Sequence, residues 1–263
     1  MQSRSLLKLT LLLASAFVFA ACSSSPTGRQ QVLLFSGGDM SQLGVQSFQE
    51  LKKQEKINHD PKINQYVQCV SHAITARVAP QLDFSEWEVV VFDSEQVNAF
   101  ALPGGKIGVY TGLLNVTKNQ DQLATVIAHE IGHVLARHGN ERLSRSQLAD
   151  AGLQLSNAVL SGSEYQSLAM AGLGLGVQYG VLMPYNRAQE SEADIIGLRL
   201  MAESGFDPKQ SIELWKNMAE ASAGNQPPEL LSTHPSHSTR IDDLQVEIAQ
   251  LPAIDVKRAN CRM

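Results

Sequence analysis

The segment Ala128–Leu135 contains the side chains of this sequence that are best arranged for chemistry. It reads Ala-His-Glu-Ile-Gly-His-Val-Leu and lies inside an apolar run that predicts a helix. His129 and His133 are four residues apart and share one helix face, so both imidazoles can bind one metal ion. Glu130 is placed to act as a general base on a water beside that ion. A catalytic zinc site uses three protein ligands, so a third must come from elsewhere.

A second segment offers the missing ligand. Within a predicted helix over 186–204, the sequence Glu-Ser-Glu-Ala-Asp runs from Glu190 to Asp194. These two carboxylates are four residues apart and share a helix face. A carboxylate from this helix would complete a site of two histidines and one glutamate, with the fourth position open. Asp194 can accept the free N–H of a metal-binding histidine. Spacing alone leaves both Glu190 and Glu192 open as the ligand.

Three motifs in this order resemble the HtpX and CAAX-prenyl-protease family of zinc peptidases. They are Ala-His-Glu-Ile-Gly-His, then Glu-x-Glu-Ala-Asp, then Thr-His-Pro with an arginine six residues after its histidine. The resemblance covers about residues 38–241 and implies a zincin-like metallopeptidase that hydrolyses peptide bonds. It implies one Zn²⁺ per chain, held by His129, His133 and Glu190, with Asp194 as the support of the ligand.

The same resemblance assigns catalytic positions to the third motif. His234 and Arg240 correspond to a histidine and an arginine that approach the zinc cleft of the family. His234 would either stabilise the oxyanion, a role that Arg240 could share, or occupy the open position of the metal and hold the enzyme off. The sequence leaves both roles of His234 open.

The N-terminus, residues 1–21, is predicted to be a lipoprotein signal peptide. Arg4 and Lys8 precede an apolar run that is short for a membrane-spanning helix. Phe-Ala-Ala-Cys resembles a lipobox, which implies that Cys22 is lipidated, and several acyl chains anchor a protein stably. Ser23 after it implies the outer membrane. We therefore expect a lipid-anchored protein on the periplasmic face of the outer membrane, most similar within the family to its outer-membrane lipoproteins.

The rest of the chain is predicted to form a tether over residues 22–37 and one peptidase domain over 38–263. The fold class is α+β and predominantly helical, because only Trp87–Phe92 and a hairpin around Pro103-Gly104-Gly105 have strand character. Everything after Thr111 is predicted helical. The net charge is −5 and no basic patch is present, so nucleic acid is not an expected partner.

The hairpin supplies the expected substrate-binding residues, Asn98, Ala99 and Phe100. Either their strand, Val97–Ala101, or the strand Lys106–Tyr110 would donate main-chain hydrogen bonds to an extended peptide. We expect the substrates to be misfolded or other envelope proteins, and outer-membrane assembly machinery to be a partner. The alternative function is a largely non-catalytic scaffold or chaperone for outer-membrane protein assembly. Glu130 argues against that alternative, because binding alone needs no general base at this position.

Two further features leave alternatives open. Cys69 and Cys261 remain after the lipobox cysteine, and in an oxidising compartment a disulfide is favoured over two separate buried thiols. Leu168–Met183 has no charge and four glycines. It is either a closely packed buried helix or an apolar segment that covers the metal cleft, and we favour the helix.

Overall fold

The contacts in the computed structural model divide the chain into two compact units. The first comprises residues 1–36 and 137–182, and the second comprises residues 37–136 and 183–263. The structure describes residues 22–78, 82, 84, 86–161, 183–222, 230, 234, 239–254 and 256–262. The predictions for the signal peptide and for residues 168–182 lie outside these described residues. All the metal-binding residues predicted above belong to the second unit.

The second unit contains a three-stranded sheet. Its strands β3 (Glu88–Phe92), β5 (Lys106–Tyr110) and β4 (Ala99–Leu102) lie in that order, with β5 parallel to β3 and antiparallel to β4. The predicted hairpin is β4–β5. Its turn contains Gly104 and Gly105, with φ values of 83° and 72°, a region that glycine adopts without steric cost. The parallel pairing of β3 with β5 was not expected from the sequence.

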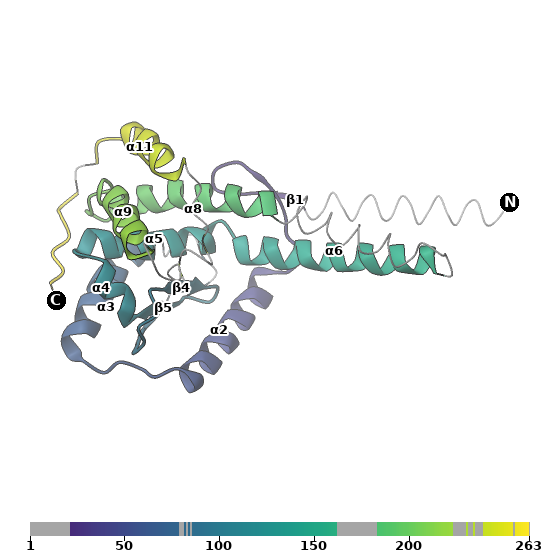
Figure 1. Cartoon of the computed structure of the whole chain (residues 1–263), viewed down its shortest axis with the longest axis horizontal. Coiled ribbons are helices and arrows are strands. Elements are labelled where there is room, and N and C mark those ends of the chain that lie inside the picture. The colour runs from purple at the N-terminus through teal and green to yellow at the C-terminus, as the bar shows by residue number, and fades with distance from the viewer. Residues whose placement is uncertain are drawn as a thin grey trace. The chain divides into compact units, whose positions relative to one another are not determined.

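Side chains of this sheet alternate between two separate cores, as the period of a strand requires. On one face, residues such as Val91, Ile107 and Val109 join the main core, to which the helices α3 (Pro61–Thr75) and α5 (Gln120–Leu135) contribute. On the other face, Phe92, Phe100 and Tyr110 pack against Phe48 of helix α2 (Gly37–Gln54). Helices α5 and α2 thus lie on opposite sides of the sheet (Figure 1).

Helix α5, which carries the first metal-binding motif, has well-defined ends. The side chain of Asn119 caps its start by accepting hydrogen bonds from the backbone N–H groups of Asp121 and Gln122. The last residue of the helix is Leu135. Arg137 adopts a left-handed conformation with φ of 55°, and the next helix begins at His138. Helix ends are predicted from glycine positions, so a turn that uses an arginine in the left-handed conformation is not predicted in this way.

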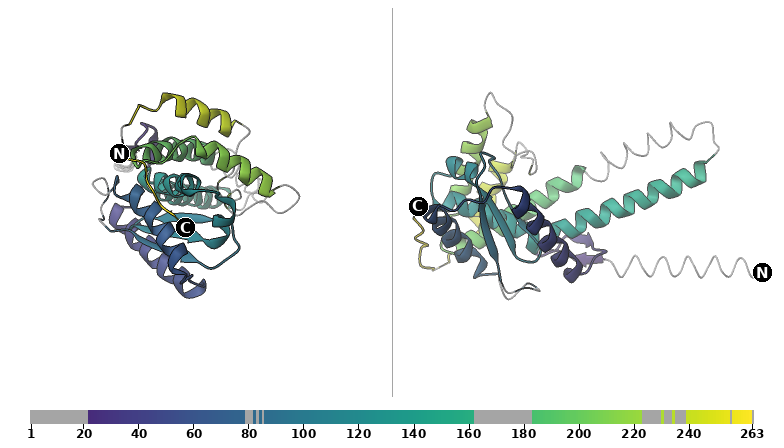
Figure 2. Two further views of the ribbon diagram at one scale, coloured as in Figure 1. Left: turned by 90° about the vertical axis from the view of Figure 1, so that its left-hand side faces the viewer. Right: turned by 90° about the horizontal axis from the view of Figure 1, so that it is seen from below.

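Helix α8 (Met183–Glu203) packs along α5, with α9 (Gln210–Ser222) and α11 (Arg240–Gln250) beside them. Glycines let α5 and α8 approach closely. A Cβ atom at Gly132 would lie 2.9 Å from the carbonyl oxygen of Ala193, and one at Gly197 would lie 3.1 Å from the amide nitrogen of His129. Figure 2 shows the resulting layers, with α5 between the sheet and α8, and α11 (yellow) outside α8. The short helix α4 (Thr111–Val116) connects β5 to α5.

The C-terminal tail is tied to this unit. Cys69 and Cys261 form a disulfide, the alternative that the sequence favoured. Next to it, the side chain of Gln120 accepts a hydrogen bond from the amide of Cys261 at 2.6 Å and donates one to the carbonyl of Ala259 at 2.7 Å. The tail therefore contacts the first residue of α5.

The first unit contains two short strands and a long helix. Strands β1 (Cys22–Ser24) and β2 (Gln30–Val32) pair antiparallel, and helix α6 (His138–Leu160) packs against β2. Arg29 donates two hydrogen bonds, of 2.9 and 2.8 Å, to the buried carboxylate of Glu141. The segment that we expected to be a tether thus contains a hairpin fastened to α6. Among the described residues, no helix has the length and apolar character needed to span a membrane.

The described structure confirms the predicted fold class. It is predominantly helical, with small sheets and a His-Glu-x-x-His helix beside one of them, as in an α+β zincin-like domain. Helical structure after Thr111 is also confirmed for the described part of the chain.

Candidate metal centre

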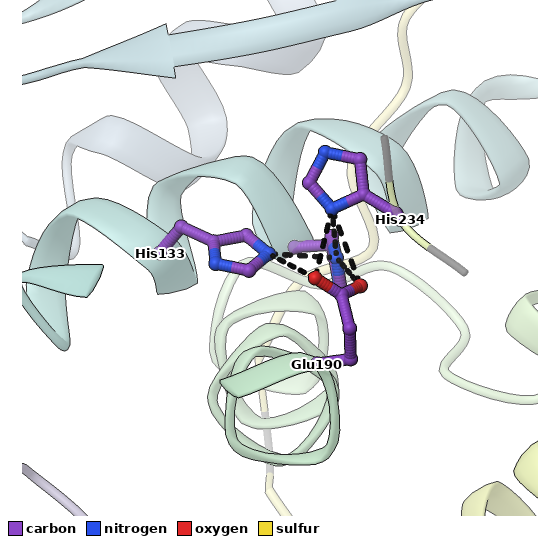
Figure 3. Close-up of side chains that lie close together, drawn as sticks. His133, Glu190 and His234 are labelled. Carbon is purple, nitrogen blue, oxygen red and sulfur yellow. Dashed lines mark hydrogen bonds and ion pairs between the residues drawn. The ribbon is translucent and has the colours of Figure 1, made fainter. Parts of the chain in front are cut away.

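Four side chains from three segments converge beside α5. His129 and His133 come from α5, Glu190 from α8, and His234 from the chain that precedes α11. Their potential ligand atoms all lie within 4.8 Å of one another, and all four residues are buried. Figure 3 shows His133, Glu190 and His234 pointing toward one another. The structure therefore brings together the three predicted ligands and adds His234 to them.

The separations between these atoms match a four-coordinate metal site. The two Nε2 atoms of His129 and His133 lie 3.1 Å apart, and each is 3.3 to 3.4 Å from a carboxylate oxygen of Glu190. His234 Nδ1 lies 3.4 Å from His129 Nε2 and 3.1 Å from Glu190 Oε1. Zinc–nitrogen bonds of ~2.0–2.1 Å at tetrahedral angles place ligand atoms roughly 3.3–3.4 Å apart. Two or three imidazoles with one carboxylate are also the donors that zinc prefers, so these residues fit a divalent ion of that kind.

A second set of contacts orients His129. Its Nδ1 atom lies 2.9 Å from Asp194 Oδ1 and donates to it, which directs the lone pair of Nε2 toward the cluster. Arg240 Nη2 donates to the same Asp194 oxygen at 2.7 Å. The predicted role of Asp194 as the partner of a metal-binding histidine thus has the required geometry.

Opposite charges in and beside the cluster stabilise one another, although their side chains are buried. Burial alone would lower the pKa of His129, but hydrogen bonds with Asp194 and Glu190 raise it to about 9, so a metal ion has to displace the Nε2 proton when it binds. Burial opposes ionisation of Glu190 as well, yet hydrogen bonds with His129 and His234 hold the pKa of its carboxyl well below the usual range. For Asp194 the charge of Arg240 has the same effect, lowering a pKa that burial would raise. Both carboxylates are therefore anionic at neutral pH.

Glu130, the predicted general base, lies beside the cluster and not within it. Its side chain is 4% exposed, and its Oε1 atom lies 3.4 Å from His234 Nε2. His234 thus faces Glu190 with one ring nitrogen and Glu130 with the other. Its backbone amide donates to the carbonyl of Leu230 at 2.8 Å, and the amide of Leu230 donates to the carbonyl of Val97 at 3.1 Å. These bonds connect His234 to the residues just before β4.

The remaining predicted positions are resolved as follows. Glu192 is buried but is not part of the cluster among the residues that the structure describes, so Glu190 is the carboxylate in ligand position. Ala99 and Phe100 lie in β4, the edge strand beside α5. The ring of Phe100 packs over Gly108 in the aromatic cluster. The strand Lys106–Tyr110 is β5, which lies between β3 and β4 and has no open edge. Asn98 precedes the strand and accepts a hydrogen bond from the amide of Tyr110.

One residue of the site, Trp215, was not expected from the sequence. It lies on α9, and the guanidinium carbon of Arg240 lies 3.7 Å from its ring centroid. No motif or helix spacing pairs these two residues, because they come from different helices. The one signal that could have suggested an aromatic partner is Arg240, if it had been predicted to be buried near the metal-binding residues.

Comparison with known proteins relates this site to a family of peptidases. Residues 61–248 match the model of peptidase family M48. The chain is 33% identical over 252 residues to the mitochondrial metalloendopeptidase OMA1 of Bos taurus, covering 91% of this chain and 48% of that protein. It is 38% identical over 175 residues to mitochondrial metalloendopeptidase OMA1 of Schizosaccharomyces pombe, covering 66% and 49%.

A bacterial relative is also similar. The beta-barrel assembly-enhancing protease of Yersinia pestis is 30% identical over 210 residues, covering 77% of this chain and 42% of that protein. The chain thus spans about half the length of these relatives.

Proposed function

This chain belongs to peptidase family M48, and from that premise we propose that it is a zinc-dependent endopeptidase of the bacterial cell envelope. The observation that carries the proposal is the buried cluster of His129, His133 and Glu190 with Glu130 beside it. A metal site of that composition next to an acid is the arrangement used for metal-assisted peptide hydrolysis. The names of its relatives, metalloendopeptidase and protease, support the same activity.

Each residue of the cluster has a separate role in the proposed reaction. His129, His133 and Glu190 would hold the zinc, and Asp194 keeps His129 in the tautomer that binds it. When bound there, zinc supplies Lewis acidity toward a water and a substrate carbonyl. Glu130 takes the proton of the attacking water and delivers it to the leaving amine.

His234 controls access in this proposal. Its Nδ1 atom stands at the fourth corner of the cluster, 3.1 Å from Glu190 and 3.4 Å from His129. A catalytic zinc site needs that corner for water or substrate. The sequence left two roles open for His234. This position favours the one in which His234 occupies the open position of the metal and must move away before substrate can bind. In the described part of the chain, the backbone amide of His234 bonds to Leu230, and the amide of Leu230 bonds to Val97 just before β4. A substrate strand entering beside β4 would compete with these contacts.

We place the substrate along β4. This strand is at the edge of the sheet and is the one that packs against α5. An extended peptide can add to such an edge through main-chain groups that point away from β5. In this register those groups belong to Ala99, whereas Asn98 bonds to Tyr110 and Phe100 is paired with Gly108, so these two residues would flank the contact.

The location and partners rest on the N-terminal sequence. The lipobox around Cys22 supports a lipid anchor in the outer membrane, and the closer resemblance to outer-membrane lipoproteins rests on the same motif. The name of the Yersinia pestis relative supports a role near outer-membrane protein assembly, whereas the OMA1 relatives are named mitochondrial. We propose misfolded or other envelope proteins as substrates and the assembly machinery as a partner.

The experiment that tests this function replaces Glu130 by Gln in the purified protein. Loss of the general base should reduce peptide hydrolysis by about 10²- to 10⁴-fold while the zinc content stays that of the wild type. Glu220→Gln, at an exposed position on α9, is the control and should keep full activity. Peptidase activity that survives in Glu130→Gln with zinc bound would refute the mechanism. In cells, a requirement for the protein but not for Glu130 would favour the scaffold alternative.

A further inference from the structure

Arg240 is a fully enclosed cation next to the metal cluster. It begins α11 and is 2% exposed. Its guanidinium carbon lies 3.7 Å from the ring centroid of Trp215, which is itself 8% exposed. A cation at that distance from a desolvated indole is attracted to the ring, and the planar guanidinium can stack on it. The indole therefore covers one face of Arg240.

The edge of the guanidinium faces the two carboxylates. Nη2 donates to Asp194 Oδ1 at 2.7 Å, and Nη1 lies 3.5 Å from Glu190 Oε2. Nη2 also lies 3.5 Å from His129 on its Nδ1 side, whereas His129 faces the cluster with Nε2. Arg240 thus lies on the side of His129 that is opposite its metal-binding nitrogen. The polar contacts of Arg240 in the described structure are with Asp194, Glu190 and His129, and the oxyanion role expected of it stays a prediction.

Besides the ring, a hydrogen bond to Asp194 and an ion pair with Glu190 hold this guanidinium in place. Its Nε and Nη1 atoms are buried and make no hydrogen bond within the described structure. A charge with unused donors would move toward water or other acceptors unless packing prevented it. The Trp215 ring, on a different helix, supplies that packing.

We propose that Trp215 is a positioning residue of the metal centre. Its ring fixes Arg240, and Arg240 in turn holds Glu190 in its ligand position and Asp194 against His129. The proposal rests on the proposed metal site but not on the reaction. It predicts that a change at Trp215, on a helix that supplies no metal ligand, loosens the hold of the site on its metal. A role in the general stability of the core would not affect metal release in this way.

The test must keep the charge of Arg240, because removing a cation beside a metal site changes metal affinity through Coulomb interactions alone. Trp215→Leu keeps that charge and removes the ring. Arg240→Lys keeps the charge but loses the planar stack and the paired donors. Trp87→Leu is the matched control, since Trp87 is a partly buried tryptophan that packs against Phe84 away from the metal cluster.

The measurement is the rate at which the zinc-loaded full chain releases Zn²⁺ to an excess of a colorimetric chelator. Outer contacts of metal ligands are worth roughly 10- to 100-fold in metal affinity. Trp215→Leu and Arg240→Lys should each speed release by about tenfold, and the double variant should also be about tenfold faster, because both changes break one linked contact. Trp87→Leu should release zinc at the wild-type rate.

Several outcomes decide the matter. Wild-type release from Trp215→Leu, or effects that multiply to about a hundredfold in the double variant, would overturn the proposal. If Trp215→Leu does not fold, Trp215→Phe keeps a weaker aromatic face and should show a smaller acceleration, and wild-type release from it would count against the proposal. The assay contains no peptide, so a zinc-binding protein without peptidase activity would refute the proposed function and leave this result standing.

Discussion

At the scale of single residues, Glu130 and His234 meet beside the cluster with 3.4 Å between Oε1 and Nε2. The same imidazole approaches Glu190 through Nδ1. This double contact places His234 between Glu130 and the predicted ligands. In the proposed reaction the attacking water would need this space, so His234 would have to leave it.

Replacing His234 by Ala distinguishes its two candidate roles. If about a tenth of the molecules is open at rest, removal of the gate should raise the hydrolysis of a short peptide roughly tenfold. The measurement is kcat/KM of the purified variant. His59→Ala, at an exposed position far from the motif in sequence, should leave the rate unchanged. A fall of about 10²- to 10³-fold would instead assign His234 to oxyanion stabilisation.

At the scale of elements, the distance between α5 and α8 determines whether two histidines and one carboxylate can bind the same metal ion. Gly132 and Gly197 occupy the contact, where an added Cβ would lie 2.9 Å from Ala193 and 3.1 Å from His129. These close approaches bring Glu190 and Asp194 to the histidine face of α5. A larger residue at either position would force the helices apart.

Gly132→Ala should therefore destabilise the protein. Overpacking a close helix contact costs roughly 1–3 kcal/mol, which exceeds the gain in helix propensity from glycine to alanine. Gly152→Ala on α6 is the matched control, because no atom lies within 4 Å of the added Cβ there. That control should gain about 0.5–1 kcal/mol. Urea denaturation measures both, and equal or increased stability of Gly132→Ala would show that the helices can accommodate the methyl group.

At the scale of the whole molecule, the disulfide links positions 192 residues apart in the chain. It holds the tail where Gln120, the first residue of α5, exchanges hydrogen bonds with Cys261 and Ala259. The start of the metal-binding helix therefore depends on residues at the far end of the sequence. A disulfide that closes a long loop removes more conformational entropy from the unfolded chain than one that closes a short loop.

Reduction of this disulfide should lower the free energy of unfolding by roughly 2–5 kcal/mol. The urea midpoint of the protein, measured with and without a reductant, gives the difference. A variant with Cys69→Ala and Cys261→Ala should match the reduced protein and should not respond to the reductant. Identical midpoints for the oxidised and reduced protein would contradict a stabilising role for the bond.

Several parts of the fold follow from local sequence. The pair His129 and His133 shares a face because of helix periodicity alone. Asn119 caps α5 through its own side chain, and the two glycines of the β4–β5 turn permit a backbone that other residues resist. Each of these features depends on residues within a few positions of one another, so a single sequence is enough to determine it.

Other parts were decided only by tertiary packing. Glu190 and Glu192 lie on one helix, and the face of that helix that meets α5 is determined by the glycine contact. His234 joins the ligands, and Trp215 stacks on Arg240, through the packing of segments that no local pattern connects. The physical reason is that periodicity and capping act over one or two turns of chain. The choice among buried partners depends instead on which surfaces of distant helices can approach closely, and that choice completed the metal centre.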